Sequence, residues 1–298
     1  MVASVIGSSR VVRDLLRQGA SVWVADSDGY TALHHAVYHK NLAVSKDLIE
    51  AGADLEARHG GIDTPLHVAA TTGFCQGMVV LIDAGANVDS RLDDGATPLF
   101  FAASDGRLEA VRVLLRANAN PLLSAYGSLP LYMAVTNGHL EVVRELVYWD
   151  GTDRCTSDGG ALALATAASR KHVDIVTFLC DAGVVDTEGV ALCAAIEGCS
   201  EACVYLLLRR QGGTANTGTR AYVNTDHGTL PEIYDEFVYT FNLGSFHAPR
   251  FARLLLEAGA DATSGVRFPC DSNEGEEDEG FIGTPLDLAT SIFVDSVQ

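Results

Sequence analysis

A repeat of about 33 residues is the feature that most constrains how this chain can fold. Related hexapeptides such as TALHHA and TPLHVA, spaced 33, 33, 32 and 33 residues apart, begin at Thr31, Thr64, Thr97, Leu129 and Leu162. Self-similarity at such a period indicates a repeat architecture, in which each repeat buries its apolar surface only against its neighbours. The sequence therefore predicts a stack of similar repeats without a single central core.

Each repeat contains two predicted helices. Thr64 is suited to cap the first helix, and Pro65 to occupy its first position, where a missing N–H costs nothing. Leu66 and Ala69 lie three residues apart and place an apolar stripe on that helix. The apolar segment VVLIDAGAN predicts a second helix, with Gly85 as the left-handed residue at its end. The predicted fold class is all-α.

The pattern resembles the ankyrin repeat, which has a 33-residue period and the motif T-P-L-H-x-A. The match at 64–69 is complete. The resemblance implies an ankyrin-repeat solenoid of stacked helix pairs with β-hairpin-like fingers. It also implies that His34 and His67 bond to the capping threonine and to the finger backbone, and that His139 and His172 occupy the loop after the first helix.

The regular part of the array is predicted to cover residues 1–208. It begins with a truncated first repeat, because residues 11–20 have the pattern of a second helix without a first. The last motif begins at Thr284, and the chain ends shortly after it. A piece of a longer polypeptide is therefore one interpretation, and degenerate terminal repeats are the other.

Residues 209–298 form an irregular C-terminal third in this prediction. A polar loop rich in Gly, Thr and Asn covers 212–228, and an acidic insertion covers 271–280. Between them, a lengthened first helix is predicted from Pro231. The irregular repeats should therefore carry two insertions.

Charge narrows the range of partners. The chain has 20 Lys and Arg against 39 Asp and Glu, a formal net charge of −19, so nucleic acid and anionic membranes are disfavoured and basic proteins are attracted. The first seven residues lack the basic region and the apolar length expected of a signal peptide, and no apolar run approaches the roughly 18 residues of a membrane helix. Seven cysteines without framework spacing fit a reducing compartment. We expect a cytoplasmic protein, with the nucleus as the alternative; the oligomeric state stays open.

Motifs of common enzymes are missing from the sequence. It contains no phosphate loop, dinucleotide fingerprint, G-x-S-x-G or H-E-x-x-H, so we predict no catalysis and no cofactor. Cys193, Cys199 and Cys203 lack the fourth ligand and the spacing of a zinc site. In the acidic insertion, Glu276 and Ile282 stand where a calcium loop requires Gly and Glu. We therefore predict no metal site.

The resemblance implies binding through the concave side, where finger tips and first-helix ends vary between family members. The corresponding residues, repeat by repeat, are Ser27, Asp28, Tyr30, Tyr38 and His39; Asp63, Thr71 and Thr72; Asp93, Asp94, Ser104 and Asp105; Ala125, Tyr126, Ser128, Thr136 and Asn137; and Asp158, Ser169 and Arg170. This set is rich in Asp and Tyr and contains no Lys. Tyrosine offers rigid contact area, whereas the aspartates are equally explained as turn formers.

These observations favour a non-catalytic protein-binding module, a scaffold or adaptor whose concave Asp/Tyr face binds a partner protein with a basic segment. Two alternatives stay open. One is the substrate-targeting segment of a larger polypeptide, such as a ubiquitin-ligase receptor, kinase or channel. The other is an enzyme with a site in the irregular region, whose candidate residues are His227, Asp235, Glu236 and His247.

Overall fold

The computed structural model describes four stretches of chain and the backbone of four short strands beyond them. The stretches are 1–58, 63–149, 158–185 and 190–210, and the strands are 219–221, 232–234, 266–267 and 282–283. The chain divides into two compact units, Met1–Thr152 (unit 1) and Asp153–Gln298 (unit 2). Within the described residues the fold is a succession of seven helix pairs, which confirms the predicted all-α class.

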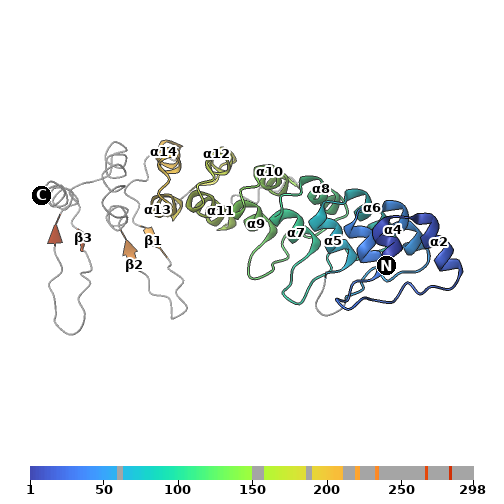
Figure 1. Cartoon of the computed structure of the whole chain (residues 1–298). Helices are drawn as coiled ribbons and strands as arrows, with labels where there is room; N and C mark the ends of the chain where they lie inside the picture. The colour runs from blue at the N-terminus through green and yellow to red at the C-terminus, as the bar shows by residue number, and fades with distance from the viewer. Residues whose placement is uncertain are drawn as a thin grey trace, which may run out of the picture. The chain divides into compact units, whose positions relative to one another are not determined.

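Unit 1 contains five helix pairs (Figure 1). The first helices are α1 (Val2–Ile6), α3 (Ala32–Tyr38), α5 (Pro65–Thr72), α7 (Pro98–Ser104) and α9 (Pro130–Thr136). The second helices are α2 (Ser9–Arg17), α4 (Leu42–Glu50), α6 (Cys75–Asp83), α8 (Leu108–Arg116) and α10 (Leu140–Tyr148). Helices α4, α6, α8 and α10 form one layer and α5, α7 and α9 another, and the connecting fingers extend beyond the first-helix layer (Figure 1).

The described residues of unit 2 form two helix pairs and two small antiparallel sheets. Its helices are α11 (Asp158–Ser169), α12 (Val173–Asp181), α13 (Val190–Glu197) and α14 (Glu201–Arg210). Strand β1 (Thr219–Ala221) pairs with β2 (Glu232–Tyr234), and β3 (Val266–Arg267) pairs with β4 (Ile282–Gly283). The residues between β3 and β4 include the acidic insertion and lie outside the described part. The division of the array at residue 208 stays a prediction.

The first repeat differs from its prediction. Helix α1 precedes α2, so the interpretation of residues 11–20 as a second helix without a first is wrong. The sequence hides this helix because it is short and lacks the motif. Asn41 stabilises its C-terminal end instead, since its Nδ2 donates to the carbonyl oxygens of Ser4 and Val5 at 2.7 and 3.2 Å. These carbonyls have no partner inside the helix.

Two further expectations are wrong in unit 2. The first is the helix predicted from Pro231, because strand β2 lies there and pairs with β1, which is inside the segment predicted as a polar loop. Ile233 and Tyr234 favour a strand, and pairing with β1 supplies the backbone partners. Helix α11 begins at Asp158, so that residue is a helix start and not a finger tip. Leu162 replaces the capping Thr and therefore lies inside the helix.

The apolar stripe of the motif forms the core of unit 1. Leu33, Leu66 and Leu99 are fully buried, and so is the alanine three residues after each of them. The small alanine side chains let consecutive first helices pack closely, and burial of each leucine contributes about 1.5–3 kcal/mol. The stack is thus held by contacts between neighbouring repeats.

His34 connects one repeat to the next. Its Nε2 lies 2.8 Å from the carbonyl oxygen of Asp63, the residue just before the next capping threonine. A carbonyl only accepts, so Nε2 carries the proton and Nδ1 accepts from the amide and hydroxyl of Thr31, at 3.2 and 2.9 Å. Burial of the ring lowers the pKa of His34, which keeps it in this neutral form.

His67 repeats the same geometry one repeat further on. Its Nε2 donates to the carbonyl oxygen of Ala96 at 3.2 Å, and Nδ1 accepts from the Thr64 hydroxyl at 2.8 Å. Burial lowers the pKa of His67 to about 4. In the following repeat Phe100 takes this position and packs in a cluster with Ala96 and Ala125. An apolar contact thus replaces the polar one.

Acid should destabilise the array through His67. The pKa of this group is about 4 in the folded chain and 6.5 as the reference value, so the unfolded chain binds more protons between these pH values. The stabilisation is complete above pH 6.5 and is lost as the pH falls toward 4. We expect the free energy of unfolding to fall by about 2 kcal/mol more between pH 7 and pH 5 in the native chain than in His67→Gln.

Urea unfolding followed by far-ultraviolet circular dichroism at the two pH values measures this difference. Glutamine keeps an N–H donor but does not titrate in this range, so groups elsewhere in the chain cancel in the comparison. The same pH dependence in both proteins would show that the pKa of His67 is not lowered in the folded chain.

Candidate functional site

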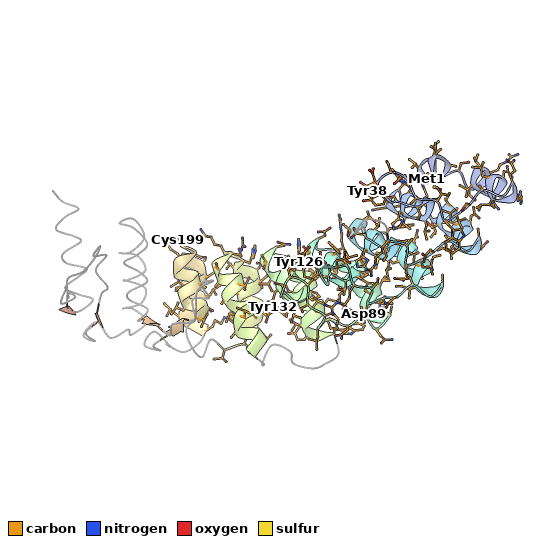
Figure 2. All side chains as sticks on the ribbon, turned by 90° about the horizontal axis from the view of Figure 1, so that it is seen from below. Met1, Tyr38, Asp89, Tyr126, Tyr132 and Cys199 are labelled. Atoms are coloured by element: carbon orange, nitrogen blue, oxygen red, sulfur yellow. The ribbon has the colours of Figure 1, made fainter. Side chains whose placement is uncertain are left out.

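The residues predicted as a binding site lie on the surface of unit 1. We call this surface the finger face; it comprises the finger tips 27–30, 93–94 and 126–128 and the first-helix ends 38–39, 71–72, 104–105 and 136–137, together with Asp63. Exposed among the predicted residues are Ser27, Asp28, Tyr30, Tyr38, His39, Asp93, Asp94, Asp105, Tyr126 and Asn137; half-buried are Asp63, Thr71, Thr72, Ser104, Ser128 and Thr136. Tyr38 and Tyr126 lie toward one edge of the unit and Asp89 toward the other (Figure 2).

Ala125 was predicted at this surface but is only 1% exposed. It packs with Ala96 and Phe100, because Phe100 has replaced the motif histidine and needs apolar neighbours. Its place on the binding surface was therefore a wrong prediction. Ser169 and Arg170 are exposed, but they belong to unit 2.

The ends of the first helices are held by the following repeat. The carbonyl oxygen of Thr71 accepts from Arg107 Nε at 3.1 Å. The carbonyl oxygen of Ser104 accepts from Asn137 Nδ2 at 2.8 Å and lies 3.0 Å from His139 Nε2. These bonds satisfy carbonyls that have no partner inside their helices. As a result, the side chains at the helix ends are presented on a fixed backbone.

A groove of about 410 Å³ opens on the finger face between α3 and α5. It is lined by Tyr30, His34, His35, Tyr38, His39, Asp63, Val68, Thr71 and Thr72. Six of these nine are predicted site residues, which the fold brings together from three segments of the chain. The hydroxyls of Thr71 and Thr72 donate to the carbonyls of His67 and Val68 at 3.0 and 2.8 Å, so their remaining lone pairs are available as acceptors.

Asp26 shapes the finger tip at one end of the groove. Its Oδ1 accepts from the backbone N–H groups of Asp28 and Tyr30, at 3.1 and 2.9 Å, and its Oδ2 lies 2.7 Å from His35 Nε2. The side-chain bond with His35 and the two backbone donors lower the pKa of Asp26, despite an opposing desolvation effect. Neither Asp26 nor His35 was predicted as a site residue. An Asp two residues before Asp28 is the sequence signal of such a turn.

Asp63 differs from the other acidic groups of the finger face. Burial, and to a smaller extent the negative charge of Asp94, raise the pKa of its carboxyl group. Its backbone carbonyl is bound to His34, but its carboxylate makes no hydrogen bond or ion pair with any residue that the structure describes. The groove thus contains a half-buried carboxylate without a protein partner in the described part of the chain.

The two adjacent aspartates of the next finger have different environments. Asp94 accepts from the Ala96 N–H at 2.8 Å and from the Tyr126 hydroxyl, so it forms the turn and holds the tyrosine. The bond with Tyr126 is the main cause that lowers the pKa of Asp94, and it raises the pKa of Tyr126. Asp93 is exposed and has no such bond within the described residues. Formation of the turn therefore explains the presence of Asp94, whereas the Asp93 carboxylate is available to a binding partner.

The described residues contain no cluster of three or more His, Cys, Asp or Glu side chains that could hold a metal ion. Cys199 precedes α14 with a φ of 52°, while Cys203 is buried in that helix, so the two do not share a helix face. The four enzyme candidates of the C-terminal region, His227, Asp235, Glu236 and His247, lie outside the described residues. Over the same described stretches, no helix has the length and apolarity required to cross a bilayer.

Removal of the Tyr126 hydroxyl should raise the pKa of Asp94. The Tyr126→Phe variant loses the bond that contributes most to the low pKa, while the Ala96 N–H keeps part of the effect. A pH titration of the side-chain carboxyl carbon by NMR measures this pKa. Tyr30→Phe is the matched control and should leave Asp94 unchanged; an Asp94 pKa equal in all three proteins would mean that the bond does not form in solution.

Three overlapping matches to the family model described as ankyrin repeats (3 copies) cover residues 1–91, 66–158 and 131–218. They include the whole of unit 1 and the helix pairs described in unit 2, and they span well over half of the chain. The resemblance stated from the motif is therefore confirmed. The chain belongs to the ankyrin-repeat family, whose repeats generally serve as modules of protein–protein interaction and are typically non-catalytic.

Proposed function

We propose that this protein is a non-catalytic scaffold or adaptor, whose finger face binds a basic segment of a partner protein. The observation that carries the proposal is the pairing of exposed tyrosines with unengaged carboxylates on one surface. Tyr38 is 61% exposed and Tyr126 is 74% exposed. Such rings provide large contact areas at low entropic cost, which is why tyrosine is common at interfaces.

Electrostatics supports a basic partner. The side chains of Asp28, Asp93 and Asp105 are exposed and make no hydrogen bond or ion pair with a described residue, so their charge is available to another molecule. The formal net charge of −19 adds a long-range attraction for basic proteins and speeds their encounter. Nucleic acid and anionic membrane surfaces meet repulsion from the same field.

The extent of the finger face also fits a protein partner. It draws on four successive repeats, and packed helices lie about 8–10 Å apart, so an extended segment can contact several repeats at once. A stable interface needs about 800 Å² from each partner. Cys75 and Cys203 are thiols that form no disulfide in the described part of the chain, in keeping with binding in the reducing cytoplasm or nucleus.

Reversal of two free carboxylates should abolish partner capture. We expect Asp93→Lys combined with Asp105→Lys to lose proteins that the native chain captures from a lysate of its source cells. The reason is that the positive side chains repel a basic segment. Glu50→Lys with Asp83→Lys is the matched control, because it makes the same charge change at exposed second-helix ends. Quantitative mass spectrometry of the captured proteins gives the readout.

The captured proteins should also dissociate as salt is raised. The Debye screening length shortens from about 10 Å at 0.1 M salt to about 3 Å at 1 M, which weakens exposed charge pairs. Circular dichroism melts must first show that native chain, variant and control are equally folded. Capture that is the same for the variant and the control, or that resists 1 M salt, would refute binding of a basic segment by this face.

A further inference from the structure

Aromatic rings form the walls of the groove between α3 and α5. Tyr30 and His35 pack with ring centroids 5.9 Å apart, and Tyr38 packs edge-on against His39 at 5.2 Å and an interplanar angle of 80°. The His35 ring is held in turn by Asp26. Each tyrosine ring of the groove thus has a histidine ring as a neighbour. Faces of tyrosine rings attract cations through their quadrupole.

Asp63 contributes a carboxylate to the same groove from the following repeat. The hydrogen bond from His34 Nε2 to its carbonyl fixes the backbone that carries it. The carboxylate is half-buried and has no partner among the described residues, and burial raises its pKa. Partial burial removes part of the hydration of this carboxylate. A cation that enters the groove would therefore offset that loss.

The lining of the groove holds no side chain that is paired with the Asp63 carboxylate. None of its nine lining residues is Lys or Arg. His34 is buried, has a lowered pKa and uses both ring nitrogens within the repeat stack. His35 Nε2 is bound to Asp26, and the His39 ring packs against Tyr38. The groove thus combines aromatic rings with one carboxylate that has no partner among the described residues.

We propose that this groove binds an arginine side chain of the partner protein, with the guanidinium group against the tyrosine rings and paired with Asp63. The inference rests on the proposed function, because it identifies the residue of the basic segment that the finger face recognises. Arginine fits better than lysine for two reasons. Its planar group stacks on aromatic faces and offers a fork of donors to a carboxylate, whereas an ammonium is compact and strongly hydrated.

The direct test titrates N-acetyl-argininamide and N-acetyl-lysinamide into the isotope-labelled full-length chain and follows its NMR signals. We expect argininamide to shift the resonances of Tyr30, Tyr38 and Val68 and to bind more tightly than lysinamide. Asp63→Asn should weaken argininamide binding about tenfold, because a hydrogen bond to a charged group is lost. Asp93→Asn makes the same chemical change outside the groove and should leave the affinity unaltered.

The aromatic wall has its own pair of variants. Tyr38→Leu should weaken argininamide binding about two- to fivefold, the range of a cation–π contact at an exposed site. Tyr38→Phe keeps the ring face and should retain the affinity of the native chain. Because Tyr38 is exposed at the end of α3, neither change removes buried core.

Three results would overturn the proposal: no shift at the groove residues, equal affinity for the two amides, or equal affinity in Asp63→Asn and the native chain. Failure of the proposed function gives a different pattern. If capture of partners depends on Asp93 and Asp105 but argininamide leaves the groove unchanged, only the arginine assignment fails. If argininamide binds as expected but no partner depends on the finger face, the guanidinium site stands and the protein-binding function falls.

Discussion

One kind of hydrogen bond, repeated between successive repeats, organises unit 1. The motif histidine of one repeat donates to the carbonyl of the residue that precedes the next capping threonine, as His34 does to Asp63 and His67 to Ala96. The bond requires a neutral ring, which burial enforces by lowering the pKa. It links the end of a finger to the helix stack, so the position of each finger follows from the packing of the helices.

The finger face depends on this bond and on its counterpart at the helix ends. Arg107 and Asn137 donate back to the last carbonyls of the preceding first helix, at Thr71 and Ser104. Finger tips and helix ends are therefore both fixed by a neighbouring repeat. A surface assembled in this way can present separate segments of chain with little loss of entropy on binding, which favours affinity. The groove between α3 and α5 is one result, since its lining comes from two repeats.

Acidic residues that look alike in the sequence have separate roles in this arrangement. Asp26 and Asp94 accept backbone N–H groups and build turns, and their pKa values are lowered. Asp63 is half-buried without a described partner, and its pKa is raised. Asp93 is exposed and unengaged. The difference is one of local backbone geometry: a carboxylate that reaches free N–H groups is used within the fold, and one that does not remains available to a partner.

The sequence by itself determined the period, the helix pairs that carry the motif and the buried Leu and Ala stripe, because these depend on local spacing and on residue types that repeat. The bonds of His34 and His67 were expected from the resemblance to the ankyrin repeat. The sequence also located most of the groove residues, as variable positions of a recognisable motif. Only the tertiary structure decided that α1 exists, that Ala125 is buried, and that Asp26 and His35 belong to the site. Each of these depends on a contact between residues far apart in the chain or on a substitution such as Phe100, which local pattern does not encode. The same holds for the meeting of Tyr38 and Asp63 in one groove, since consecutive repeats place them together only when they stack.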